Sequence, residues 1–219
     1  MSTTEIHLIS GPLDNGHFLA VASRVHHLLD YIHLRDKDAT AGRLVQLAES
    51  LLDRGVPAPK LIINDRVDAA LCAGAGGVQL AWHSLRPGPV KSRWPDLRVG
   101  CSVHSAQEAE EAFAQGADYV LFGHIYPSSS KPGLPGRGLG ALQETVSRSC
   151  GPVIALGGIL PGHVPAILRQ GAAGFAVLSG IGSASDPVAA AWSYRRAAGR
   201  SALGPHGENA DDPNRPAPE

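Results

Sequence analysis

Short runs of consecutive apolar residues recur along the chain and alternate with longer segments of helical period. In the segments between the runs, apolar residues return on one helical face, as Leu44, Leu47, Ala48 and Leu51 do. Apolar runs without polar alternation are typical of parallel strands that are covered on both faces. Eight strands are expected, near Ile6–Ile9, Tyr31–Leu34, Leu61–Ile63, Val78–Leu80, Val99–Ser102, Tyr119–Phe122, Val153–Leu156 and Phe175–Leu178.

A glycine that ends an amphipathic helix just before the next strand is a recurring feature. It occurs in the segments 51–64, 71–80, 113–122 and 168–178, and glycine suits this stop because it accepts the left-handed conformation. Ser105 and Glu108 form a capping-box pattern at the start of another helix. The alternation predicts a single-domain parallel (β/α)8 TIM barrel over residues 1–197, with an open doubly wound sheet as the alternative. No Gly-x-Gly-x-x-Gly follows the first strand, which weakens that alternative. Residues 198–219 have no apolar period; we expect a disordered polar tail and assign it no function.

Composition narrows the class of protein. The chain has 219 residues with 19 basic and 20 acidic side chains, a net charge of −1, so no nucleic acid or anionic membrane is expected as a partner. The longest apolar runs are about five residues, whereas a membrane span requires roughly 20. The first residues lack the pattern of a signal peptide. Three unpaired cysteines indicate a reducing compartment. We therefore expect a cytoplasmic enzyme acting on a small molecule, and a homo-oligomer stays open.

The end of the sixth predicted strand carries the densest group of polar residues. His124 follows an apolar strand and a glycine, and three serines and Lys131 come within the next seven residues. In such a barrel the loops at the carboxyl ends of the strands form the active site. Histidine changes charge near neutral pH, so His124 is the first candidate for proton transfer.

Two other strand ends point to anionic ligands. After the second strand, His33, Arg35 and Lys37 alternate and are expected on one side; the simpler interpretation is a solvated charge cluster. After the seventh and eighth strands come Gly157-Gly158 and Ser179-Gly180. Glycines let backbone amides approach a phosphate, and a phosphate between the last two strands recurs in these barrels. The simpler interpretation of each is a tight turn.

The sequence evidence for a metal site is weaker than the evidence for an anionic ligand. Asp65 follows the third strand and is able either to bind Mg²⁺ or to cap the next helix. For His83 the pattern favours a surface position over a metal or substrate ligand. For His104 it favours a pocket position and a helix-capping role equally. No His-x-His or His-Glu-x-x-His pattern is present, which argues against zinc.

Together the strand ends resemble the thiamine phosphate synthase/TenI family from about residue 6 to 197. The segments that carry the resemblance are 32–37, 61–70, 100–105, 123–131, 152–158 and 177–180. The resemblance implies a (β/α)8 barrel and one of two activities. One joins a hydroxymethylpyrimidine diphosphate to a thiazole phosphate with Mg²⁺. The other, TenI, isomerises a carboxythiazole phosphate to its aromatic tautomer without a cofactor.

Three positions favour TenI by this resemblance. Ser84 replaces a metal-binding Asp typical of synthases, and Gln79 replaces a His in the same motif. His33 stands where synthases usually have Gln. Phe122-Gly123-His124 resembles the TenI motif that contains its catalytic histidine. Asp65 points the other way, because it keeps a synthase metal ligand.

We therefore expect a thiazole tautomerase with His124 as acid and base, no cofactor and no metal. Thiamine phosphate synthase, with Mg²⁺, is the alternative, and a catalytically silent phosphate binder is a third hypothesis. The residues expected to bind the thiazole phosphate substrate are His33, Arg35, Lys37, Asn64, Gln79, Ser102, His104, Ser128, Ser130, Lys131, Gly157, Gly158, Ser179 and Gly180.

Overall fold

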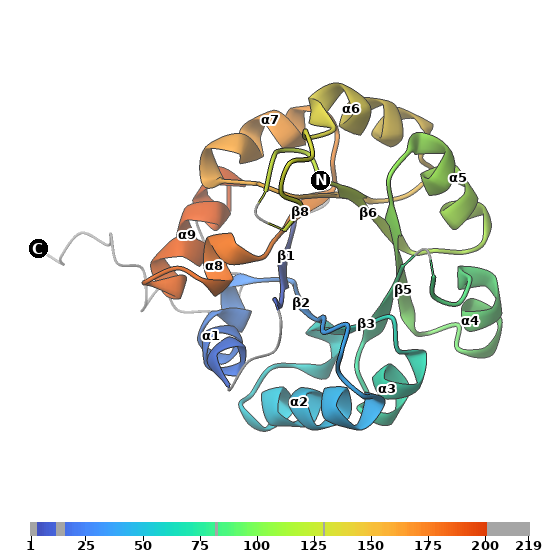
Figure 1. Cartoon of the computed structure of the whole chain (residues 1–219), viewed down its shortest axis with the longest axis vertical. Coiled ribbons are helices and arrows are strands. Elements are labelled where there is room, and N and C mark those ends of the chain that lie inside the picture. The colour runs from blue at the N-terminus through green and yellow to red at the C-terminus, as the bar shows by residue number, and fades with distance from the viewer. Residues whose placement is uncertain (1–3, 12–15, 82, 129, 201–219) are drawn as a thin grey trace, which may run out of the picture.

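The strands form a closed barrel in chain order. The structure is a computed structural model that describes residues 4–11, 16–81, 83–128 and 130–200. Over these residues eight parallel strands pair in the order β1 to β8, and β8 pairs with β1 (Figure 1). The strands are β1 Glu5–Ile9, β2 Tyr31–Leu34, β3 Leu61–Asn64, β4 Gly77–Leu80, β5 Arg98–Val103, β6 Tyr119–Gly123, β7 Val153–Leu156 and β8 Gly174–Val177. Closure confirms the predicted (β/α)8 barrel and rules out the open sheet.

Helices surround the barrel (Figure 1). They are α1 His17–Val25, α2 Ala41–Asp53, α3 Val67–Cys72, α4 Pro87–Arg93, α5 Ala106–Ala114, α6 Gly138–Arg148, α7 Val164–Arg169, α8 Ser179–Gly182 and α9 Pro187–Ala197, with 3-10 turns η1 His26–Leu28, η2 Ala58–Lys60 and η3 Pro161–His163. No helix in the described part of the chain is long and apolar enough to cross a membrane. Residues 201–219, most of the predicted tail, lie outside the described residues.

The local signals for helix ends act as predicted. Gly55, Gly74, Gly116 and Gly171 all have positive φ at the four predicted helix stops. At the start of α5 the Ser105 hydroxyl accepts from the backbone amide of Glu108 at 3.1 Å. The Glu108 carboxylate accepts from the amide of His104 at 2.7 Å, one residue before the position that a standard capping box uses.

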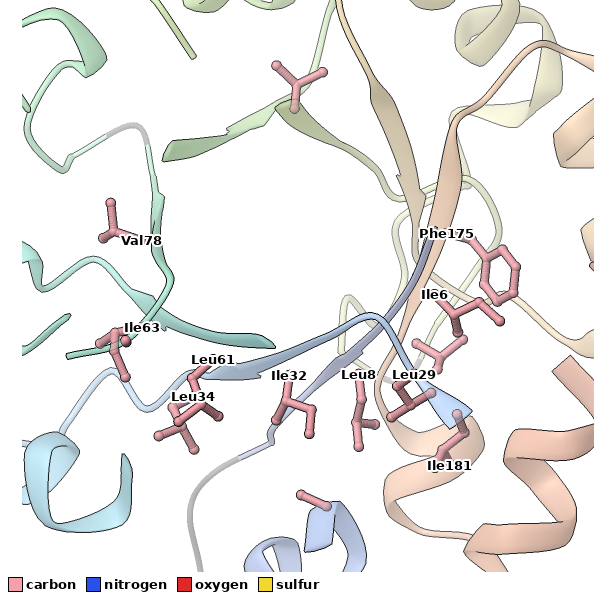
Figure 2. Packing of buried hydrophobic residues seen from close by; sticks show 14 of the residues in the cluster. Ile6, Leu8, Leu29, Ile32, Leu34, Leu61, Ile63, Val78, Phe175 and Ile181 are labelled. Carbon is pink, nitrogen blue, oxygen red and sulfur yellow. The ribbon is translucent and has the colours of Figure 1, made fainter. Parts of the chain in front are cut away.

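Side chains on the strands separate into two layers. Ile6, Leu8, Ile32 and Leu34 point away from the barrel axis toward the helices (Figure 2). Because side chains alternate along a strand, the residues between them point inward. One apolar cluster in this interior contains Ile9, Tyr119, Leu121, Ile154 and Ala176, with Leu156 and Leu178 packed against them. The two layers explain why the strands are apolar on both faces.

Candidate active site

A cavity of about 450 Å³ opens at the carboxyl ends of the strands, where the sequence predicts the site. Its walls come mainly from β5 to β8 and their following loops, and Arg35 enters from β2. Apolar side chains, among them Leu121, Leu156 and Ile159, form much of the wall. Of the residues predicted to form the site, those that line this cavity are Arg35, Ser102, His104, His124, Ser128, Ser130, Lys131, Gly157, Gly158, Ser179 and Gly180.

Four predicted residues do not line this cavity: His33, Lys37, Asn64 and Gln79. Strand β2 ends at Leu34, so the two-residue alternation that placed Lys37 beside Arg35 no longer applies, and Lys37 is exposed. His33 is fully buried inside the barrel. Gln79 is also buried and donates to the Ser102 hydroxyl at 3.1 Å, one layer below the cavity wall. Asn64 lies beside Gln79 in register, at the end of β3.

The glycines after β7 form the part of the wall that side chains would block. Gly157 and Gly158 have φ of 103° and 63°, which favours glycine. A Cβ on Gly157 would collide with His124, and one on Gly158 would collide with the backbone oxygen of Pro127. The backbone is therefore bare at the cavity, where it is able to approach a ligand closely.

Cations and hydroxyls complete an anion-binding surface around these glycines. Ser128, Ser130 and Lys131 line the cavity from the loop after β6, and Ser179 lines it at the start of α8. Arg35 lines it from the opposite side. Neither Arg35 nor Lys131 forms a salt bridge with an acid among the described residues, so both charges are available to a ligand. Hydroxyls, bare backbone and two free cations suit a phosphorylated molecule.

His124 has a structural task in addition to its place in the cavity. Its Nε2 lies 2.9 Å from the backbone oxygen of Pro135, so this nitrogen carries the proton and donates it. The ring is 7% exposed, and its Nδ1 is buried without a hydrogen-bond partner among the described residues. Arg137 donates through Nε to the backbone oxygen of Gly123 at 3.1 Å. The imidazole thus helps to fold the loop after β6 back over the strand end.

Asp65 lies beside Ser84 at the ends of β3 and β4. Asp65 has a φ of 68°, in the left-handed region, which aspartate tolerates better than most residues. Its Oδ1 accepts from the Ser84 hydroxyl, and its Oδ2 lies 3.5 Å from Nε2 of His83. The N-cap of α3 is Arg66, without a side-chain cap. The alternative of a helix cap for Asp65 is therefore wrong, and its carboxylate is directed across the strand ends.

Asp65 and Ser84 together provide the minimum set of protein ligands with which Mg²⁺ binds. The described residues contain no group of three acidic, histidine or cysteine side chains that would enclose a metal. Mg²⁺ commonly binds to one or two carboxylates together with substrate phosphates. Asp65 supplies one exposed carboxylate and Ser84 a neutral oxygen, so the donors fit a metal that arrives with a phosphorylated substrate.

A line of polar side chains, of which His7 and His33 are fully buried, runs through the barrel interior beneath this region. His7 Nδ1 lies 2.9 Å from His33 Nε2, and His7 Nε2 lies 3.0 Å from Glu5 Oε2. Arg98 donates to the same Glu5 oxygen at 2.8 Å. Sequence reasoning assigned no role to His7 and did not consider Glu5 or Arg98. One available signal was a histidine in the middle of an otherwise apolar strand.

The comparisons with known proteins agree with the barrel and decide the family. A family model described as thiamine monophosphate synthase matches residues 6–181. A thiamine-phosphate synthase of Anaeromyxobacter dehalogenans is 42% identical over 178 residues, which cover 79% of this chain and 80% of that protein. The chain belongs to the thiamine monophosphate synthase family. This confirms the family resemblance, and the family's name implies small phosphorylated ligands.

Two further comparisons support the same family assignment. A thiamine-phosphate synthase of Chlorobium phaeovibrioides is 41% identical over 164 residues, covering 73% of this chain and 78% of that protein. Among solved structures, thiamine phosphate pyrophosphorylase from Pyrococcus furiosus superposes with a TM-score of 0.77 at 27% identity, over 91% of this chain and 98% of that chain.

The expected activity requires a correction. The sequence favoured a thiazole tautomerase, an isomerase, but the family members that match at about 40% identity are named thiamine-phosphate synthases. The tautomerase prediction is wrong, and the synthase alternative is the better supported one. The acid and base role given to His124 belonged to that prediction and falls with it. The structure supplies a physical reason for this histidine, since its Nε2 holds the loop through Pro135.

Proposed function

We propose that this protein is a thiamine-phosphate synthase. In this reaction the methylene carbon of the pyrimidine loses its bond to the diphosphate oxygen, and pyrophosphate leaves with the electron pair. A new bond forms between that carbon and the ring nitrogen of the thiazole phosphate. The observation that carries the proposal is one cavity with two anion-binding sides, the glycine side of β7 and β8 and the Arg35 side, because the reaction joins two phosphorylated substrates.

The glycine side suits the thiazole phosphate. Bare backbone at Gly157 and Gly158, together with the hydroxyls of Ser128 and Ser179, surrounds one part of the cavity. A monophosphate held there would place its attached ring against the apolar wall. Binding energy then offsets much of the entropy that the two substrates lose when they are brought together for reaction.

The opposite side suits the diphosphate. Arg35 brings a positive charge from this side, and Lys131 brings a second one to the same cavity from the loop after β6; neither forms a salt bridge with a described acid. Asp65 and Ser84 would hold Mg²⁺ at the ends of β3 and β4. When bound, the metal would neutralise charge on the leaving pyrophosphate. Arg35 and Lys131 add to that stabilisation from this chain's own side chains.

The apolar walls support the reaction in a second way. The attacking ring nitrogen brings its own lone pair, so no side chain has to remove a proton before attack. A pyrimidine carbon that is losing pyrophosphate is electron-poor and would react with water. Leu121, Leu156 and Ile159 line the cavity, and excluding water protects such a centre.

The direct test supplies both substrates to the purified protein with Mg²⁺ and measures pyrophosphate and thiamine phosphate. We expect both products in equal amounts, with loss of activity in EDTA. Lys131→Ala should lower the rate at least about tenfold, because a charge-assisted contact is removed. Gly162→Ala is the matched control, since a Cβ there meets no atom within 4 Å. Absence of both products from the wild-type protein would refute the proposed function.

A further inference from the structure

Two side chains in the turns that follow β3 and β4 face each other at a separation that suits a metal ion. Oδ2 of Asp65 lies 3.5 Å from Nε2 of His83, which is longer than a good hydrogen bond. Two atoms that each lie about 2.1 Å from one ion are about 3.0 Å apart at an octahedral angle and about 3.4 Å apart at a tetrahedral angle. One ion is therefore able to contact both atoms after little movement of either side chain.

The Ser84 hydroxyl orients the carboxylate for this contact. Ser84 Oγ donates to Oδ1 of Asp65 and accepts from the backbone amide of Ala81 at 2.7 Å. A hydroxyl has two lone pairs, so Ser84 keeps one of them for a ligand. The φ of 68° at Asp65 is the one positive value for a residue other than glycine in the described chain, and strain of this kind is typical of functional sites. The local structure thus engages Oδ1 and leaves Oδ2, which faces His83, to a cation.

The pair is open to solvent and lies near the larger cavity. The side chains of Asp65 and His83 are 43% and 48% exposed, so a hydrated ion is able to reach them. Ser84 lines a second cavity of about 230 Å³, which shares Ser102 with the larger one. The metal position and the substrate cavity are therefore neighbours.

The donor atoms favour some divalent ions over others. Mg²⁺ prefers oxygen ligands, whereas imidazole nitrogen suits first-row transition ions, and carboxylate oxygen suits Mn²⁺ as well as Mg²⁺. Asp65 and Ser84 by themselves form a set with oxygen only. When His83 is added, the set contains one nitrogen, and its affinity is expected to be higher for transition ions than for Mg²⁺.

We propose that His83 is a metal ligand, and that it makes the site at Asp65 selective for a divalent transition ion, such as Mn²⁺, over Mg²⁺. The imidazole binds through Nε2, so Nδ1 carries the ring proton. His83 is exposed, as the sequence pattern favoured, but an exposed residue is able to bind a metal when a substrate phosphate completes the coordination. The choice of ion does not depend on the proposed function, whereas the task of the ion in releasing pyrophosphate rests on it.

Electron paramagnetic resonance tests the ligand, with Mn²⁺ added alone to the full chain. We expect bound Mn²⁺ in the wild-type protein to show coupling to a histidine nitrogen in pulsed spectra, and His83→Gln to lose this coupling. His17→Gln is the matched control, because it makes the same substitution at an exposed histidine of α1, and it should keep the coupling. Three results would overturn the proposal: no Mn²⁺ binding by the wild type, bound Mn²⁺ without nitrogen coupling, or coupling that persists in His83→Gln.

Binding constants test the selectivity. Glutamine puts an amide oxygen near the position of the lost nitrogen, and Mg²⁺ binds that oxygen well. His83→Gln should therefore weaken Mn²⁺ binding at least about tenfold, since loss of a residue that only supports a metal ligand already costs about 10- to 100-fold. Mg²⁺ binding should change by less than about threefold. Equal losses for the two ions would mean that His83 acts on the site without binding the metal, and would overturn the assignment.

Activity separates this inference from the proposed function. In the wild-type protein, the Mn²⁺ concentration for half-maximal pyrophosphate release should be at least about tenfold below that for Mg²⁺, and in His83→Gln the two should agree within about threefold. Equal concentrations in the wild type would overturn the selectivity. If the wild-type protein releases no pyrophosphate with either ion, the proposed function fails, and the nitrogen coupling alone decides whether His83 is a ligand.

Discussion

The two sides of the barrel bind ligands by different means. On the β6 to β8 side, the interior below the cavity is apolar, with Leu121, Ile154 and Ala176, and the anion-binding wall is backbone at Gly157 and Gly158. On the β1 to β5 side, the interior contains His7, His33 and Gln79, and the strand ends present side chains such as Asp65. The first side depends on bare backbone at its two glycines, and the second depends on side chains alone.

The difference has a physical origin. A wall of bare backbone requires residues with a left-handed conformation or with other atoms too close for a Cβ, and glycine alone meets these conditions without strain. Beneath such a wall, a rigid apolar interior is sufficient support. A side-chain site has to satisfy each buried polar group, so it extends inward through hydrogen-bond partners. Substitutions should therefore act locally on the glycine side and at a distance on the polar side.

The largest expected effect is on the polar side. Asp65→Asn keeps a residue that tolerates the left-handed conformation but removes the charge. We expect Mg²⁺-dependent product formation to fall by about 10³-fold, since metal stabilisation of the leaving group is worth several kcal/mol. Steady-state rates against Mg²⁺ concentration measure this. Activity within about threefold of the wild type would place the metal elsewhere.

Ser84→Asp sharpens the same point in the opposite direction. A second carboxylate beside Asp65 should lower the Mg²⁺ concentration for half-maximal activity about tenfold, because opposite charges attract the cation. Without metal the two carboxylates repel each other, so the melting temperature should fall in EDTA and recover with Mg²⁺. A melting temperature that does not respond to Mg²⁺ would contradict this account.

On the glycine side, Gly158→Ala should lower kcat/KM by about 100-fold. Its φ of 63° and the collision with Pro127 impose strain of about 1–3 kcal/mol, and the added methyl displaces the phosphate. KM for the thiazole phosphate should rise more than KM for the diphosphate. A comparable rise in both constants would mean that the two sides are not separate sites. Gly162→Ala again serves as the neutral control.

The smallest effect concerns stability against pH. Because the pKa values of His7 and His33 are both lowered in the folded state, the unfolded chain binds more protons below about pH 6.5. Their contribution is full above that pH and is lost as pH falls. The free energy of unfolding should fall by at most about 1.4 kcal/mol per pH unit for each histidine. Urea unfolding from pH 7 to 5 measures the slope, which His7→Gln should reduce; an equal slope would mean that His7 does not contribute to it.

Much of the site was predictable because it lies at strand ends. A strand run and a following glycine locate the barrel mouth by local rules, so His124, Lys131 and the Gly157-Gly158 pair were all assigned to the cavity they line. Lys37 was misplaced because the end of β2 at Leu34 depends on pairing with other strands. The activity was misjudged because single substitutions, such as Ser84 for a carboxylate, were given more weight than they carry.

By itself the sequence determined the barrel, since apolar strands and helix-ending glycines act through neighbours a few residues away. It also determined the anion-binding glycines, because their conformational freedom belongs to the residue. Only the tertiary structure decided the polar interior. His7 and His33 are 26 positions apart, and which nitrogen of His7 carries a proton depends on the carboxylate of Glu5. Closure of the barrel brings these groups within hydrogen-bond distance.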